Sequence, residues 1–209
     1  GSSTLLLTDC APNAQMVKLV YPERITPRGS KIKYPQVEVT WYDGGIQPPK
    51  PAGWPAGKDM NNGGGGVLFH GTKDTLVCGC YGRDPWLLSG RVPSVARTER
   101  RVPEGVNHEM DWVRACKESP ESRVASKSDF AEAGPFNEMV VMGVLAVRLQ
   151  GLNKELEWDG EKMQFTNIKD DETVKICVED AFTIKDGHPT FTKKCTDPMN
   201  AKQFASEMV

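Results

Sequence analysis

The stretch Gly134–Leu149, GPFNEMVVMGVLAVRL, decides how the rest of the chain must be arranged. Its apolar residues do not keep to one narrow stripe at a helical period, and a helix without a polar face is buried on more than one side. Pro135 marks its start, because a proline at the first helical position lacks only an N–H that would be unpaired anyway. Arg148 and Gly151 mark its end. We therefore expect a core helix that lies on a sheet.

Alternating apolar and polar residues predict the strands of that sheet. Gln15–Tyr21 and Gln36–Tyr42 alternate cleanly, and in the second stretch Val37, Val39 and Trp41 point to the face that meets the helix. Further hairpins are expected over Gly66–Tyr81 and, around the turn Asp186-Gly187, within Thr173–Lys194. Two more helices are predicted, one after Asn107 and one that Asp197 caps.

Hairpins joined in sequence favour antiparallel pairing, which predicts the α+β class: an open, mainly antiparallel β-sheet with helices packed on one face. The 209 residues suffice for one domain with its own core, so we expect residues 1–209 to form a single domain. The chain opens on Gly1 and stops at Val209 within a helical pattern, and we expect it to be truncated at both ends.

Charge and hydropathy narrow the range of partners. The 26 basic and 28 acidic residues are nearly balanced and form no basic stripe, so we expect no nucleic-acid partner. No apolar run in the sequence approaches the length of a membrane span, so we expect no membrane partner.

Metal and phosphate sites are not expected. Cys78 and Cys80 stand two residues apart, but no second pair of cysteines or histidines follows at a zinc-like spacing, so free thiols are the better interpretation of the six cysteines. The glycine run at 63–66 precedes a predicted strand, whereas a dinucleotide-binding loop follows one. We expect no catalytic, cofactor-binding or metal-binding residue in this chain.

Four residues are candidates for binding a substrate. Trp41, Tyr42 and Asp43 end a predicted strand, and an aromatic pair beside a carboxylate is typical of a sugar-contacting corner. His108 begins a predicted helix beside Glu109, where it could act as a general base or simply lie at the surface. For Trp41, Tyr42 and Asp43, the alternative is that the tryptophan belongs to the core and the aspartate simply forms the turn that follows it.

A set of short motifs recurs in one order in a known family. The chain resembles the C-terminal domain of a bacterial Gfo/Idh/MocA-type oxidoreductase over about Thr40 to Asn167. The motifs are Val39–Gly45 (VTWYDGG), Gly66–Gly71 (GVLFHG), Cys78–Gly82 (CGCYG), Asn107–Trp112 (NHEMDW), Ala133–Pro135 (AGP) and Leu156–Asp159 (LEWD).

The resemblance implies a parent protein with a Rossmann domain that binds NAD(P) and a catalytic lysine in a Glu-Lys-Pro motif. Neither that motif nor the Asp-x-x-x-His motif expected early in the second domain occurs here. The chain would then be the part that shapes the substrate site for a sugar or polyol, inert by itself. A parent that is an NAD-dependent glycosidase, or a stand-alone carbohydrate-binding or assembly domain, is the alternative. The compartment stays open between bacterial cytoplasm and periplasm.

A partner is also expected for the sheet itself. Glu38, Thr40 and Tyr42 lie on the face opposite the predicted helix, and such a polar face with an aromatic residue suits a protein interface. In the family that resembles this chain, the open face is an oligomer surface. We therefore expect a homo-oligomer that forms through the sheet face.

Overall fold

The computed structural model describes residues 1–4, 10–25, 31–61, 64–94 and 105–209. Contacts between Cα atoms divide the chain into two compact units. The larger unit joins Gly1–Ile46 with Trp112–Val209, and the smaller unit is Gln47–Asp111. The expectation that the whole chain folds as a single domain stays a prediction.

A three-stranded antiparallel sheet carries the N-terminal part of the larger unit. Its strand order is β1 (Ser2–Ser3), β2 (Gln15–Tyr21) and β5 (Val37–Asp43), and β3 (Arg24–Ile25) pairs with β4 (Lys33–Tyr34) in the connection between β2 and β5. The register pairs Gln15 with Asp43 and Tyr21 with Val37. Both long strands were predicted from alternation, to within one residue at each end.

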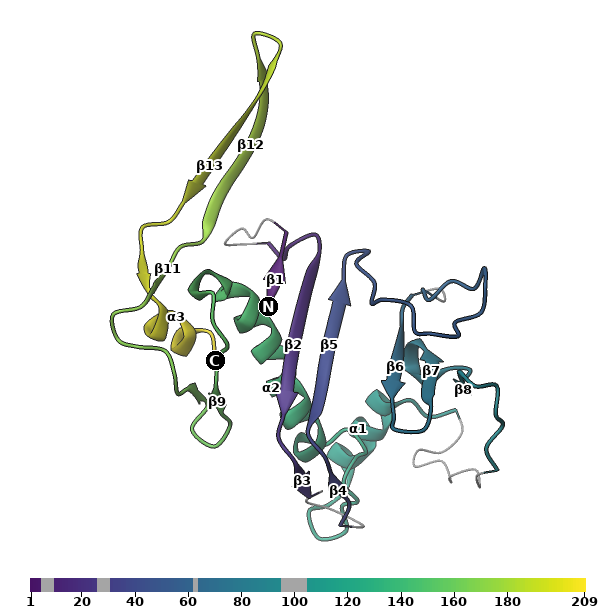
Figure 1. Cartoon of the computed structure of the whole chain (residues 1–209). Coiled ribbons are helices and arrows are strands. Elements are labelled where there is room, and N and C mark those ends of the chain that lie inside the picture. Colours follow the sequence, from purple (N-terminus) through teal and green to yellow (C-terminus); the bar gives the residue numbers. More distant parts are fainter. Residues whose placement is uncertain (5–9, 26–30, 62–63, 95–104) are drawn as a thin grey trace. The chain divides into compact units, whose positions relative to one another are not determined.

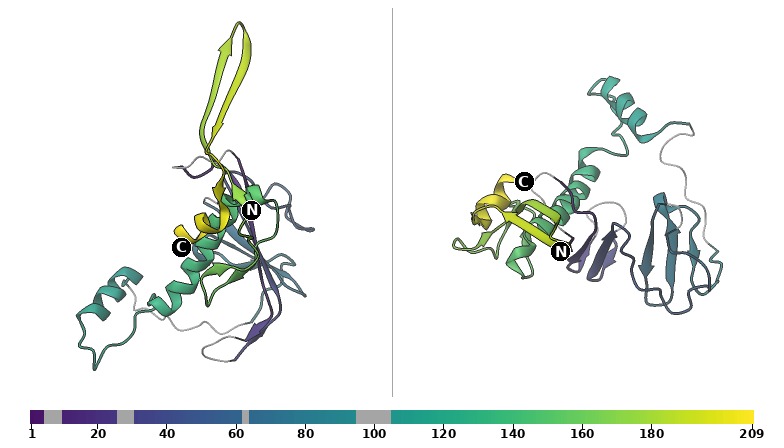
Figure 2. Two further views of the ribbon diagram at one scale, coloured as in Figure 1. Left: turned by 90° about the vertical axis from the view of Figure 1, so that its left-hand side faces the viewer. Right: turned by 90° about the horizontal axis from the view of Figure 1, so that it is seen from above.

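Helix α2 (Phe130–Arg148) lies along one face of this sheet, as Figures 1 and 2 show. It contacts β1 and β2, and at Gly143 its nearest neighbour is the side chain of Val17 on β2. The helix begins earlier than predicted because Asp129 caps it: the Asp129 carboxylate accepts a hydrogen bond from the Glu132 N–H. Pro135 therefore lies inside the helix, not at its first position.

The expectation that α2 is buried on more than one side holds only for its C-terminal half, where Leu145 packs in the C-terminal core and Gly143, on the opposite side, faces Val17 of β2. Leu145 and Val147 are buried, whereas Phe136, Val140 and Val144 form an exposed apolar stripe at four-residue spacing. The stripe is exposed because the sheet and the C-terminal elements cover the other sides of α2. By length and composition alone, α2 is also long and apolar enough to cross a membrane, so the expectation of no membrane partner stays a prediction.

The C-terminal part of the larger unit is built from short elements that close the core. A 3₁₀ turn (Gln150–Leu152) follows α2, and α3 (Ala201–Glu207) ends the chain. Leu145 and Leu149 pack with Ile168, Val174 and Ala201 in the core cluster. The strand pairs are β9 (Trp158–Asp159) with β10 (Gln164–Phe165), β11 (Thr173–Val174) with β14 (Met199–Asn200), and β12 (Cys177–Lys185) with β13 (His188–Cys195).

The final helix begins later than the sequence predicts. Asn200 caps α3 by accepting a hydrogen bond from the Gln203 N–H at 2.9 Å, so Asp197 is not the cap. The physical reason is that residues 199–200 are extended and pair with residues 173–174 in β11. The predicted hairpin turn at Asp186-Gly187 is confirmed, with positive φ angles at both residues.

The smaller unit is a three-stranded antiparallel sheet with the order β6 (Gly66–His70), β7 (Thr75–Gly79) and β8 (Trp86–Leu87). The predicted hairpin of β6 and β7 is confirmed, and a 3₁₀ turn (Cys80–Gly82) follows it. Helix α1 (His108–Lys117) begins after Asn107, whose side chain accepts a hydrogen bond from the Met110 N–H, and it contains the boundary between the units.

The predicted α+β class is confirmed. Three α-helices and short antiparallel strands in open sheets make up the described part of the chain.

Candidate functional site

The C-terminal end of β5 is a tight corner that fixes the Asp43 carboxylate. Gly44 has a φ of +69°, and a Cβ there would lie 2.0 Å from the Asn13 carbonyl oxygen, so only glycine fits. The Gly44 N–H donates to Asp43 Oδ1 at 2.6 Å, and Gln15 Nε2 donates to Asp43 Oδ2 at 3.3 Å. The carboxylate is thus held on both oxygens and remains exposed to solvent.

Trp41 lies two residues before Asp43, which places both side chains on the same face of β5. The prediction that Trp41 meets the central helix is wrong, because 62% of this residue is exposed. Its cross-strand partner Val17 is buried under α2, and the helix does not extend its cover to the neighbouring edge strand. Trp41 is therefore not a core residue. Its flat aromatic ring is exposed on the same face of the strand as the fixed Asp43 carboxylate.

Of the two other candidates, Tyr42 does not join this corner. Tyr42 points to the opposite face of β5, where it is half-buried and pairs with Met16. His108 belongs to the smaller unit, where its exposed ring places Nε2 3.3 Å from Glu109 Oε1. The sequence predicted all four as candidate substrate contacts, and within the larger unit the corner contains Trp41 and Asp43.

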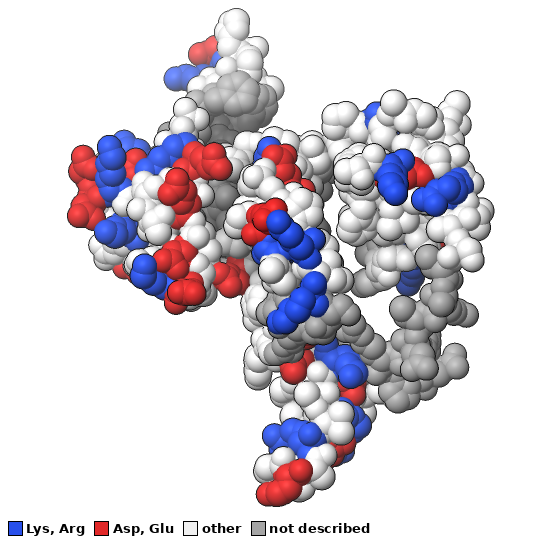
Figure 3. All heavy atoms as spheres, turned by 60° about the horizontal axis from the view of Figure 1, so that its bottom comes forward, with Lys and Arg blue, Asp and Glu red and all other residues white. Residues whose placement is uncertain are grey.

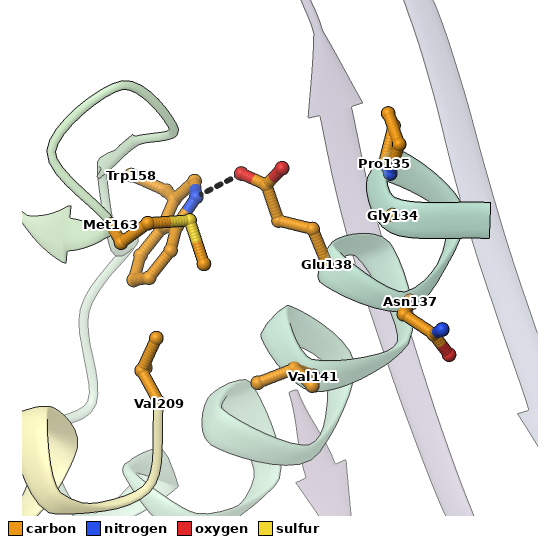
Figure 4. A pocket seen from close by; sticks show the side chains of 8 residues that line it. All are labelled: Gly134, Pro135, Asn137, Glu138, Val141, Trp158, Met163 and Val209. Atoms are coloured by element: carbon orange, nitrogen blue, oxygen red, sulfur yellow. Dashed lines mark hydrogen bonds between the residues drawn. The ribbon is translucent and has the colours of Figure 1, made fainter. Parts of the chain in front are cut away.

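A second candidate site, which sequence reasoning missed, lies between α2 and β9. A cavity of about 430 Å³ is bounded by residues of α2 such as Val141, by Trp158 of β9, by Met163 in the turn after β9 and by the C-terminal Val209 (Figure 4). Trp158 Nε1 donates to Glu138 Oε1 at 2.7 Å across it. A Cβ on Gly160 would lie 2.6 Å from the same oxygen, so the glycine makes room for the carboxylate. The signal in the sequence was a single Glu within the apolar run of α2.

The charge of Glu138 also acts on Tyr21, at the end of β2. Burial raises the pKa of the Tyr21 hydroxyl, the negative charge of Glu138 raises it further, and Arg24 opposes the shift. Among the described residues this buried hydroxyl has no hydrogen-bond partner. Arg24 places its guanidinium 5.6 Å from the centre of the Tyr21 ring and 5.4 Å from that of Tyr34. Tyr21 therefore stays protonated at neutral pH and keeps an unused donor.

A second cavity of about 360 Å³ lies on the other side of Trp158 and Met163, where Phe165, Lys202 and Gln203 line it. Trp158 and Phe165 form an edge-to-face pair with ring centres 5.0 Å apart. The Trp158 indole thus lines both cavities, and its N–H donates to Glu138 in the cavity of about 430 Å³.

In the smaller unit, the rings of Trp54 and Trp86 contact each other at a tilt of 56°, with ring centres 5.5 Å apart. Lys58 Nζ lies 3.9 Å from the centre of the Trp86 ring. The Trp54 N–H donates to the Lys58 carbonyl at 2.8 Å. Trp54 lies in a segment rich in proline and glycine that joins β5 to β6. Its one tryptophan is anchored within its own unit.

Within the described part of the chain, no three His, Cys, Asp or Glu side chains gather as a metal site would require. Cys78 ends up buried in β7, and Cys80 begins the following 3₁₀ turn, so the two do not share one strand. In the glycine run, residue 63 lies outside the described residues, and Gly64 and Gly65 have positive φ angles.

Comparison with known proteins adds no family to these observations. No family model matches the chain, and no curated protein matches it.

Proposed function

We propose that this chain is the substrate-site and oligomerisation domain of an NAD(P)-dependent oxidoreductase that acts on a sugar or polyol. The proposal combines the family resemblance of six ordered motifs with one observation of geometry. That observation is the corner at the end of β5, where Trp41 is exposed beside the doubly held carboxylate of Asp43. The nicotinamide would be bound by a Rossmann domain of the parent protein, which supplies the redox chemistry.

The corner has the two kinds of group that a sugar requires. The C–H face of a pyranose or a cyclic polyol packs against a flat aromatic ring, and an ionised carboxylate accepts strong hydrogen bonds from hydroxyl groups. Trp41 and Asp43 offer these groups on the same side of one strand. The hydrogen bonds that Asp43 accepts from Gly44 and Gln15 hold the carboxylate in place before a ligand arrives, which lowers the entropic cost of binding.

The proposal is tested by titrating the 209-residue chain with hexoses, hexitols and inositols while ligand-observed NMR reports binding. Asp43→Asn keeps the shape and the acceptor for Gly44 but removes the charge, so we expect about a tenfold loss of affinity. Trp41→Ala is expected to abolish binding. Trp112→Ala, which removes another exposed tryptophan, is the matched control and should bind like the wild type.

Equal binding by wild type and Trp41→Ala would remove the corner as the sugar site. Separate titrations with NAD and NADP test whether this chain binds the cofactor itself. We expect no binding of either cofactor by this chain, and micromolar binding would contradict the assignment of the cofactor to another domain. A stand-alone carbohydrate-binding domain would bind sugar through the same corner, so sugar binding does not distinguish it from a domain of an oxidoreductase. A Rossmann domain encoded upstream in the same gene would support the oxidoreductase.

A further inference from the structure

Two cysteines face each other where the hairpin of β12 and β13 leaves the core of the larger unit. Cys177 is the first residue of β12, Cys195 is the last residue of β13, and the register pairs them directly. Their sulfur atoms lie 3.3 Å apart. Directly opposed residues on antiparallel strands have Cα atoms about 4.5–5.5 Å apart, which lies inside the range that disulfide bonds accept.

An irregularity in the hairpin brings this pair together. From Lys185 and His188 at the turn to Glu179 and Lys194, the pairing is continuous. If this register continued unchanged, Cys195 would pair with residue 178. Instead the register shifts between Cys177 and Glu179, so one extra residue stands in β12 and Cys177 moves opposite Cys195.

The residues on the core side of the pair hold it in place. The Thr196 N–H donates to the Ile176 carbonyl at 2.8 Å, and the Ile176 N–H donates to Thr196 Oγ1 at 3.1 Å. Ile176 and Val174 are buried. Beyond the cysteines, β12 and β13 pair with each other, and no other described strand pairs with them (Figure 1). An isolated two-stranded hairpin is marginally stable in water, so its root is where a covalent link has most effect.

We propose that Cys177 and Cys195 form a reversible disulfide bond that closes the root of this hairpin. The oxidant is a low-molecular-weight disulfide, and the reaction is thiol–disulfide exchange. The Cys195 thiolate attacks one sulfur of the oxidant, forms a mixed disulfide and releases one thiolate. The Cys177 thiolate then attacks the Cys195 sulfur, forms the protein disulfide and releases the second thiolate. Two protein thiols lose two electrons, the oxidant gains them, and the two released thiolates take up the two protons.

The exposure of the two thiols sets the order of these steps. Cys195 is exposed, whereas Cys177 is buried. An oxidant therefore reaches Cys195 first, and Cys177 serves as the resolving thiol at 3.3 Å. Closure links the strands across the hairpin and leaves fewer open conformations for them to visit.

The experiment incubates the reduced 209-residue chain with oxidised glutathione, traps free thiols with iodoacetamide and maps the linked peptides by mass spectrometry. We expect a peptide in which Cys177 is linked to Cys195 within one chain, and its reduction by dithiothreitol. We also expect slower amide hydrogen exchange in β12 and β13 after oxidation. Cys177→Ser should retain glutathione on Cys195, whereas the wild type should not.

Cys195→Ser changes an exposed thiol and leaves the buried side unaltered, so it tests the link even if Cys177→Ser folds poorly. It should contain no linked peptide. Cys116→Ser removes another exposed thiol and should form the link like the wild type. Glutathione that stays on Cys195 of the wild type, or a Cys195 disulfide between two chains, would overturn the proposal.

Discussion

Adjacent residues on α2 have very different surroundings. Leu145 is fully buried (0% exposed) and belongs to the core cluster with Leu149 and Val174, whereas 45% of Val144 is exposed. The sequence gives the two residues the same apolar character. Their energetic contributions differ because a deleted buried side chain leaves a cavity and a deleted exposed one does not.

We expect Leu145→Ala to lower the free energy of unfolding by about 2–5 kcal/mol, the usual cost of this truncation in a core. Val144→Ala is the matched control and should change it by less than about 1 kcal/mol. Urea denaturation followed by circular dichroism measures both. Equal losses for the two variants would mean that the exposed stripe of α2 is covered in solution.

Alternation along β5 predicted correctly which residues share a face, because the side-chain period of a strand is two. It could not predict that Val17 would be covered and that Trp41, directly opposite, would be exposed. Coverage depends on where α2 crosses the sheet, and no local pattern encodes that position. The Asp43 half of the candidate site was predictable from its turn, whereas the contact of Glu138 with Trp158 joins residues 20 positions apart.

At the scale of elements, one residue, Glu172, connects three segments near the C-terminus. Glu172 accepts hydrogen bonds from Lys154 Nζ at 2.8 Å and from the Lys169 N–H at 2.8 Å. Its carbonyl accepts from the Ala201 N–H at 2.9 Å, at the start of α3. The hydrogen bond from Lys154, followed by that from Lys169, lowers the pKa of Glu172 below its ordinary value of 4.5.

This shift predicts a pH dependence. A carboxyl whose pKa is depressed by folding stabilises the fold above its unfolded pKa and loses that contribution as pH falls through its folded pKa. We expect Glu172→Gln to melt at a lower temperature than wild type at neutral pH. The difference should shrink once pH falls below about 4.5, the ordinary value. Calorimetric melting at several pH values measures it.

Asp171→Asn, at the neighbouring exposed carboxylate, is the control and should show a smaller change in melting temperature at every pH. A melting difference for Glu172→Gln that stays constant from neutral to acid pH would contradict the role of the ionised carboxylate.

The types of the elements followed from the sequence more closely than their boundaries did. The hairpin of β6 and β7 and the turn at Asp186-Gly187 were predicted because turn residues carry a strong local signal. The starts of α2 and α3 were not predicted correctly: Pro135 lies inside α2, and Asp197 precedes the cap of α3. Asn200 caps α3 because residues 199–200 pair with β11, and a local reading of caps does not contain that pairing. Asp129 caps α2 through a local hydrogen bond, which its carboxylate accepts from the Glu132 N–H.

At the scale of the whole molecule, charge is dispersed. Figure 3 shows lysine and arginine side chains interspersed with acidic ones on the face that it draws. Within the larger unit, ion pairs such as Lys154 with Glu172 and Lys202 with Asp170 join the two signs. On the β2–β5 sheet, Lys18 likewise pairs with Glu38, so charges of both signs lie on the face that would meet a second copy.

The last prediction concerns the face of the β2–β5 sheet that points away from α2. Met16 and Val20 are exposed there, Tyr42 is half-buried, and Lys18 pairs with Glu38 at 2.9 Å.

We propose that two copies associate through this face. Thr40 lies opposite Lys18 in the register, near the centre of the face. In a two-fold interface the same patch meets itself, so Thr40→Arg places four positive charges close together and should abolish association. Sedimentation velocity over a range of protein concentrations measures it. Ser122→Arg, on an exposed loop, adds the same charge elsewhere and should associate like the wild type. A wild type that stays monomeric at high concentration, or a Thr40→Arg variant that associates equally well, would remove this interface.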